Sequence, residues 1–231
     1  MSTPMITAPT DRRGFFKRAG LGLGAVAAVS TLQACDSDPV TPPPAGAVTL
    51  DFSSDVGVLN YAYALEQLEA GFYATVIANS AFTSTFSSSE QAILRDIAAH
   101  EAIHDDFFKT AIMAAAPTQI IPRLTADFSS INFANKASVL GTAQVFEDLG
   151  VSAYNGAGRF IASDDYLTLA GKIVSVEARH ASIISGLLQA NAISSPGQLD
   201  ANALDISKTP QMVIGAASTY IVETINVTNA G

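Results

Sequence analysis

The sequence predicts an all-α fold: a four-helix bundle with one long crossover between the second and third helices, followed by a short C-terminal extension. Apolar residues make up 48 % of the chain and charged residues 14 %, so one sizeable core can be buried. Four stretches have the apolar spacing of helices. Their connections are short, long and short, the layout of a bundle with one crossover. We expect the bundle at residues 51–193 and the extension at residues 194–231.

Residues 1–35 have the pattern of a bacterial export signal. Arg12 and Arg13 open a basic segment, and an uncharged stretch of 16 residues follows from Ala19 to Ala34. Such a stretch is too short for a comfortable membrane span. A basic head before a short apolar body is typical of an export signal instead. The basic segment resembles the twin-arginine signal, which exports proteins that have already folded.

Cys35 is the only cysteine of the chain, so no intramolecular disulfide can form. The run Leu32-Gln33-Ala34-Cys35 resembles a bacterial lipobox, which implies cleavage before Cys35 and attachment of lipid to its sulfur. The alternative is an ordinary thiol in a plain signal peptide. Residues 36–50 are rich in proline and small polar residues, as in a semi-extended tether. We therefore expect an exported protein of the periplasm or cell envelope, anchored by lipid.

The chain beyond the signal is strongly acidic. Eight basic and 20 acidic residues follow Cys35, which gives a net charge of −12 with histidine neutral. Such a surface repels nucleic acid and anionic lipid. Nucleic-acid binding is therefore excluded, and membrane contact is expected only through the N-terminal lipid or signal. The sequence leaves the oligomeric state open, and a homo-oligomer is compatible with it.

The first two helices are expected at residues 55–78 and from Ser87 to about Ala116. The candidates for the first N-cap are Ser53, Ser54 and Asp55. The apolar stripe of this helix consists of Leu65, Leu68, Phe72 and Val76. The second helix opens on Ser87-x-x-Glu90, which is the pattern of a capping box.

The crossover that follows contains two prolines. The third helix is expected at about residues 135–161, and the fourth follows Ser163-Asp164-Asp165 and ends near residue 190. Helices of about 24 to 28 residues span roughly 35 to 42 Å, which is usual in a bundle. The extension allows two outcomes, a short helix over residues 212–220 or an extended end over residues 220–227.

Two of the three histidines close the same four-residue pattern. His104 follows Glu101 by three residues, and His180 follows Glu177 by three. Positions i and i+3 lie on one face of a helix, so each pattern aims a carboxylate and an imidazole in one direction. Carboxylate and imidazole are ligands of redox-capable first-row metals. The two patterns together predict a metal site.

The other two helices each offer a glutamate at mid-length, Glu147 on the third and either Glu66 or Glu69 on the first. A carboxylate buried alone would cost several kcal/mol, and convergence on cations removes that cost. Glu66 and Glu147 are each followed seven residues later by a tyrosine, Tyr73 and Tyr154, whereas Glu69 is not. We therefore prefer Glu66 and keep Glu69 as a second candidate. The tyrosines either donate hydrogen bonds to ligand carboxylates or are ordinary core residues.

With these residues the chain resembles the ferritin-like superfamily, in particular bacterial ferritin-like domain proteins related to plant desiccation-related proteins. Residues 59–70 and 99–104 carry the resemblance, which covers roughly residues 51–191. It implies two metal ions held by two bridging glutamates, two terminal glutamates and two histidines that bind one metal each. Glu101 and Glu177 would be the bridging glutamates, and Glu66 and Glu147 the terminal ones. His104 and His180 would each bind one metal.

Iron is the first choice of metal and manganese the second, because a carboxylate-rich site with few imidazoles suits both. The resemblance implies that the reduced metal pair reacts with dioxygen or peroxide. Iron oxidation, peroxide removal and substrate oxidation share this ligand set, so the ligands do not choose among them. Turnover as a di-iron oxidoreductase does not follow from the ligands alone.

Two alternatives remain open. The run from His100 to His104 also matches the HExxH pattern of zinc hydrolases, in which both histidines bind zinc. That interpretation leaves the second Glu-x-x-His unexplained. With a metal pair, His100 would instead lie about 100° from the metal face of its helix, either near a ligand or at the surface. A bundle of this kind can also be metal-poor and act as a structural or stress-protective protein.

Overall fold

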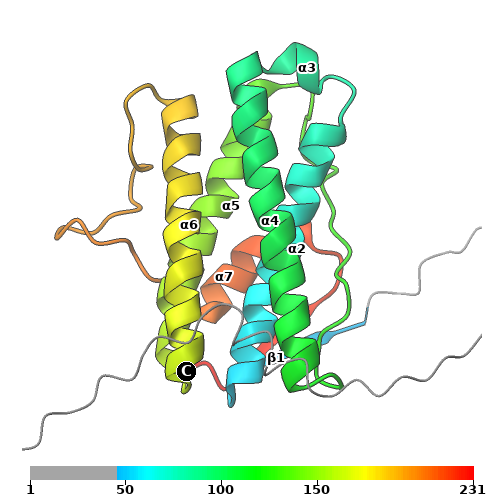
Figure 1. Ribbon diagram of the computed structural model, residues 1–231, viewed down its shortest axis with the longest axis vertical. Helices are drawn as coiled ribbons and strands as arrows, with labels where there is room; N and C mark the ends of the chain where they lie inside the picture. The colour runs from blue at the N-terminus through cyan, green and yellow to red at the C-terminus, as the bar shows by residue number, and fades with distance from the viewer. Residues whose placement is uncertain (1–45) are drawn as a thin grey trace, which may run out of the picture. The chain divides into compact units, whose positions relative to one another are not determined.

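The computed structural model describes residues 46–231 and shows four long helices side by side (Figure 1). They are α2 (Asp55–Ala78), α4 (Ser88–Ala115), α5 (Lys136–Ala157) and α6 (Asp164–Leu188). Helix α2 packs mainly against α4, and α5 packs mainly against α6, so the bundle is built from two helix pairs. This arrangement confirms the all-α bundle that the sequence predicts.

The export signal, Cys35 and most of the tether lie outside the described residues, so these expectations stay predictions. Within residues 46–231, no helix has the length and apolar character needed to cross a membrane.

Short elements complete the domain. They are β1 (Val48–Asp51), α3 (Phe82–Thr85), the 3-10 helix η1 (Gly158–Phe160), α7 (Pro210–Ala217), the 3-10 helix η2 (Ser218–Tyr220) and β2 (Ile225–Thr228). Both outcomes that were open for the C-terminal extension occur: the short helix α7 comes first, and the extended end that contains β2 follows it. The tether was expected to reach residue 50, whereas β1 begins at Val48 and pairs in parallel with β2.

The starts of three long helices follow their local capping signals. Ser87 and Glu90 form the capping box of α4. The side chains of Asn135 and Ser163 accept hydrogen bonds from the first turns of α5 and α6. At α2 the N-cap makes no side-chain bond. Instead, the Asp55 carboxylate accepts backbone N–H groups at 2.7 and 3.0 Å from the turn before α6, which joins the two helix pairs.

The crossover between α4 and α5 lies along α2 and is held there by two buried amide side chains. The Asn60 oxygen accepts the Ile121 N–H at 2.9 Å, and the Gln67 oxygen accepts the Leu124 N–H at 2.7 Å. Asn60 and Gln67 are seven residues apart and therefore share one face of α2. Their bonds satisfy backbone groups that a buried loop would otherwise leave unpaired.

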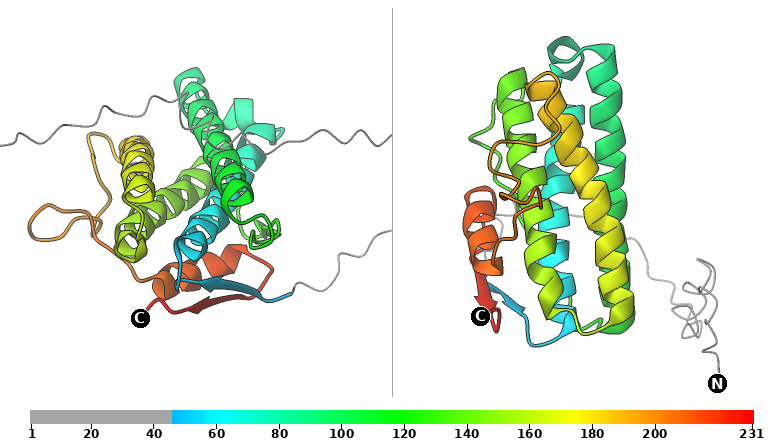
Figure 2. Two further views of the ribbon diagram at one scale, coloured as in Figure 1. Left: turned by 60° about the horizontal axis from the view of Figure 1, so that its bottom comes forward. Right: turned by 90° about the vertical axis from the view of Figure 1, so that its left-hand side faces the viewer.

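The C-terminal extension packs on α5. Figure 2 shows α7 and the two strands together on one side of the bundle. The Lys208 N–H donates to the Ser152 carbonyl at 3.0 Å. A Cβ atom at Gly156 would lie 1.8 Å from the Lys208 carbonyl oxygen, so only glycine allows this crossing. The Tyr220 ring packs edge-on against Phe146 of α5, with centroids 4.8 Å apart, and so seals that side of the core.

Candidate metal centre

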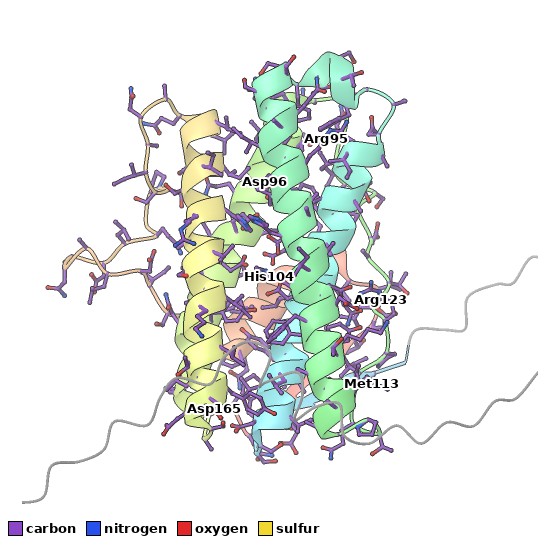
Figure 3. The ribbon with its side chains drawn as sticks, viewed as in Figure 1. Arg95, Asp96, His104, Met113, Arg123 and Asp165 are labelled. Carbon is purple, nitrogen blue, oxygen red and sulfur yellow. The ribbon has the colours of Figure 1, made fainter. Side chains whose placement is uncertain are left out.

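The four long helices bring six side chains to the middle of the bundle. Helices α2 and α5 contribute one glutamate each, and α4 and α6 contribute one Glu-x-x-His each; the residues are Glu66, Glu147, Glu101, His104, Glu177 and His180. Figure 3 shows His104 at about mid-height, between α4 and α6. The i, i+3 spacing works as expected, because each glutamate and its histidine face the bundle axis together.

These side chains form two groups, each with four ligand atoms within 4.8 Å of one another. Glu66 and His104 belong to the first group, and Glu147 and His180 belong to the second. Glu101 and Glu177 belong to both. Each group could hold one metal ion, and the two ions would then share two carboxylates.

The two shared glutamates each face both histidines. The Glu101 oxygens lie 3.4 Å from His104 Nδ1 and 2.7 Å from His180 Nδ1. The Glu177 oxygens lie 3.0 Å from His104 Nδ1 and 3.9 Å from His180 Nδ1. In each glutamate, one oxygen is directed to one group and the second oxygen to the other. A carboxylate placed in this way could be shared by two cations.

The remaining two glutamates each serve one group. Glu66 Oε2 lies 3.4 Å from His104 Nδ1, and Glu147 Oε2 lies 3.5 Å from His180 Nδ1. All four glutamates are fully buried, and His180 is 4 % exposed. The His104 side chain, at 12 % exposed, is the part of the centre nearest to solvent. Water is therefore largely excluded from the centre by the helices themselves.

The polar atoms of the centre lie close together but are not aligned for hydrogen bonds with one another. Ten buried side-chain atoms within residues 46–231 make no hydrogen bond, and eight of them belong to the six residues of the centre. They are both oxygens of Glu101 and of Glu177, one oxygen of Glu66 and of Glu147, and the Nδ1 atoms of His104 and His180. Buried polar groups without partners are costly, so a cluster of them indicates a place for cations.

Two tyrosines complete the environment of the terminal glutamates. The Tyr154 hydroxyl donates to Glu66 Oε1, and the Tyr73 hydroxyl donates to Glu147 Oε1. Each tyrosine thus bonds the glutamate of the other helix, because seven residues along its own helix amount to about 10 Å. One oxygen of each glutamate is held in place, and the other is left for the centre. The sequence left open whether the tyrosines bond a ligand carboxylate or only pack in the core, and the structure shows the bonds, each to the glutamate of the other helix.

Burial and charge determine the protonation of the metal-free centre. Burial raises the pKa of Glu66 and of Glu147 to about 7. It also raises the pKa of Glu177 well above its usual range. Burial acts against ionisation of Glu101 as well, but the two neighbouring imidazoles hold its pKa at about 2.

The imidazoles respond in the opposite direction. Burial lowers the pKa of each histidine, but the surrounding carboxylates outweigh that effect and raise it to about 12 for His104 and about 10 for His180. Protons therefore occupy the metal-free centre at neutral pH, where they neutralise part of the charge that cations would otherwise balance.

His100 does not join His104 as the HExxH interpretation requires. His100 Nδ1 lies 2.9 Å from His180 Nε2, and the two rings stack. His100 belongs to neither group of candidate ligands. The structure therefore places His100 beside a candidate ligand, one of the two positions that the sequence allowed.

Glu69 is buried beside the centre but belongs to neither group. Burial, together with the charges of the neighbouring glutamates, raises its pKa well above the usual range. A Cβ atom at Gly150 would lie 3.2 Å from Glu69 Oε1 and 3.7 Å from Glu177 Oε2. Gly150 of α5 therefore leaves room for the carboxylates of Glu69 from α2 and Glu177 from α6. Sequence reasoning missed this role, and the signal was a glycine one turn after Glu147.

The comparisons with known proteins agree with this geometry. The family model described as "Ferritin-like domain" matches residues 54–190, which contain all four long helices and all six candidate ligands. A search of curated proteins gives no match to this chain. The match covers more than half of the sequence. The chain therefore belongs to the ferritin-like domain family.

Proposed function

We propose that this protein holds two metal ions, iron first and manganese second, and uses them in redox chemistry with dioxygen or peroxide. The observation that carries the proposal is the pair of four-residue groups that share Glu101 and Glu177. A single-metal site needs no shared carboxylates, whereas two adjacent cations do.

The donor set fits such ions. Four carboxylates and two neutral imidazoles carry a charge of about −4, which balances two divalent cations. Each ion would have three carboxylates and one nitrogen, a composition that suits iron and manganese and contains no sulfur. Glu66, Glu101, His104, Glu147, Glu177 and His180 would hold the two ions.

The residues around the centre have three tasks. When bound, two adjacent reduced ions would supply the electrons for reduction of dioxygen or peroxide. Tyr73 and Tyr154 fix the outer glutamates by hydrogen bonds, so these carboxylates do not need to reorient when the charge of the centre changes. The helices bury the glutamates completely and so keep bulk water out of the centre, which strengthens every electrostatic interaction inside. His104, mostly buried, lies where the centre comes nearest to solvent.

The test is anaerobic addition of Fe²⁺ to the metal-free protein, followed by mixing with dioxygen or hydrogen peroxide. We expect two Fe²⁺ per chain and rapid oxidation with the near-ultraviolet absorption of Fe³⁺. The control variant Asp96→Asn with Asp106→Asn removes two exposed carboxylates from α4 and should bind and oxidise iron as the wild type does. A chain that binds no metal, and melts at the same temperature with and without Fe²⁺, would instead support the structural or stress-protective alternative.

We also propose that the domain is exported and held at the cell envelope by lipid on Cys35. The twin-arginine-like and lipobox-like segments of the sequence support this proposal. Expressed in a bacterium, the wild-type protein should sediment with membranes, whereas Cys35→Ala should appear in the soluble fraction. Equal distribution of the two proteins would contradict lipid attachment.

A further inference from the structure

The two candidate metal positions differ in the surroundings of their histidines, because only His180 contacts a third histidine, His100. His180 directs Nδ1 toward Glu101 and Glu147, and its other nitrogen, Nε2, lies 2.9 Å from His100 Nδ1. The two rings stack with centroids 5.2 Å apart and planes inclined by 19°. His180 is 4 % exposed, and His100 is half-buried on α4, so the pair joins the centre to the outer part of the bundle.

This contact assigns the hydrogen atoms once a cation is bound. If His180 holds a metal ion through the lone pair of Nδ1, its neutral ring would carry the hydrogen on Nε2. That N–H then donates to His100 Nδ1, which must be the unprotonated nitrogen of its ring. A hydrogen bond of this kind holds a ligating ring in one tautomer and orientation and increases its electron donation to the metal.

His104 has no equivalent support. Its Nδ1 faces Glu66, Glu101 and Glu177, but no protein group within residues 46–231 forms a hydrogen bond with its Nε2. The sequence shows the same difference between the two motifs. The residue before the first Glu-x-x-His is His100, whereas the residue before the second is Val176. Valine has neither a donor nor an acceptor in its side chain.

We propose that His100 is a positioning residue for one metal position alone and makes the centre asymmetric. The position formed by Glu147 and His180 binds its ion more tightly and fills first, and the position formed by Glu66 and His104 fills second. This inference rests on the proposed function, since it requires that both positions hold a metal.

The test is a titration of the metal-free protein with Co²⁺, followed by visible absorption. The wild type should show two separate binding steps. In His100→Leu, the tighter step should weaken by roughly 10- to 100-fold, the usual effect of removing a partner of a metal-bound histidine. His100→Asn places an acceptor oxygen close to the original Nδ1 and should retain most of the affinity. Val176→Leu, the matching change in the other Glu-x-x-His, should leave both steps unchanged.

Two further backgrounds assign the effect to one position. In His104→Ala, which retains the His180 position, His100→Leu should still weaken binding. In His180→Ala, which retains the His104 position, His100→Leu should have no effect. An equal effect in both backgrounds, or the same loss in Val176→Leu, would mean that His100 only packs the bundle, and the inference would be wrong. A wild type that binds no Co²⁺ would instead overturn the proposed function, and this inference with it.

Discussion

Replacing Glu101 and Glu177 together by glutamine is expected to abolish binding of both metal ions. Each carboxylate faces both histidines, so the double variant removes charged ligands from the two positions at once. Removal of one partner from a buried ionic interaction costs about 3 to 5 kcal/mol. Since about 1.4 kcal/mol corresponds to a factor of ten, the two changes should weaken affinity by roughly 10⁴-fold or more.

Glutamine keeps the volume of the glutamate side chain, so loss of metal would not be a consequence of a cavity. Metal analysis after dialysis against a fixed free-metal concentration gives the stoichiometry, and circular dichroism checks that the helices are intact. The variant Asp96→Asn with Asp106→Asn makes the same chemical change at exposed positions of α4 and should keep two ions. Two ions per chain in the Glu101 and Glu177 variant would show that the metal binds elsewhere.

The metal-free protein should lose stability as the pH rises from about 5 to 8. The folded-state pKa of Glu66 and of Glu147 is about 7, above the usual value of 4.5. Their contribution to the free energy of unfolding is therefore complete below pH 4.5 and is lost as the pH rises through 7. The pKa values of His104 and His180 are raised from 6.5 to about 12 and about 10, so their contributions begin to fall above pH 6.5 and add to the loss toward pH 8.

The expected change is large. One unit of pKa shift corresponds to about 1.4 kcal/mol, so each of the two carboxyl groups contributes up to about 3 kcal/mol. For a domain of this size, 1 kcal/mol corresponds to roughly 2 to 4 °C of melting temperature, so the two groups, at about 6 kcal/mol together, lower the melting temperature by up to roughly 12 to 24 °C. Melting curves of the chelator-treated protein at pH 5 and pH 8 measure it. Glu66→Gln with Glu147→Gln should flatten the dependence, and an unchanged slope in that variant would contradict the assignment.

The metal-bound protein should show the opposite trend. Cations need ionised carboxylates and neutral imidazoles, so binding must displace the protons of the metal-free centre. Metal affinity should therefore rise between pH 5 and 8, and proton release should accompany the binding. The pH of maximum melting temperature should therefore be higher for the metal-loaded protein than for the metal-free protein.

Local signals determined most of the secondary structure. The Ser87 and Glu90 capping box, the polar residues before α5 and α6 and the apolar spacing act within one or two helical turns, so they can be read from a short stretch of sequence. The same is true of the two Glu-x-x-His patterns, because i and i+3 always share a helix face. The same spacing of seven residues separates Glu66 from Tyr73 and Glu147 from Tyr154, and this repeat favoured Glu66 over Glu69. The structure places only Glu66 in a group of candidate ligands.

Relations between helices were decided by tertiary structure alone. The stagger of α2 against α5 pairs each tyrosine with the opposite glutamate, and it places Gly150 beside Glu69. The packing of α4 against α6 turns His100 toward His180 rather than toward solvent. The β1–β2 pair joins segments more than 170 residues apart. A helix periodicity specifies which face of a helix is buried, but the partner, the rotation and the height of the facing helix depend on how all the side chains pack.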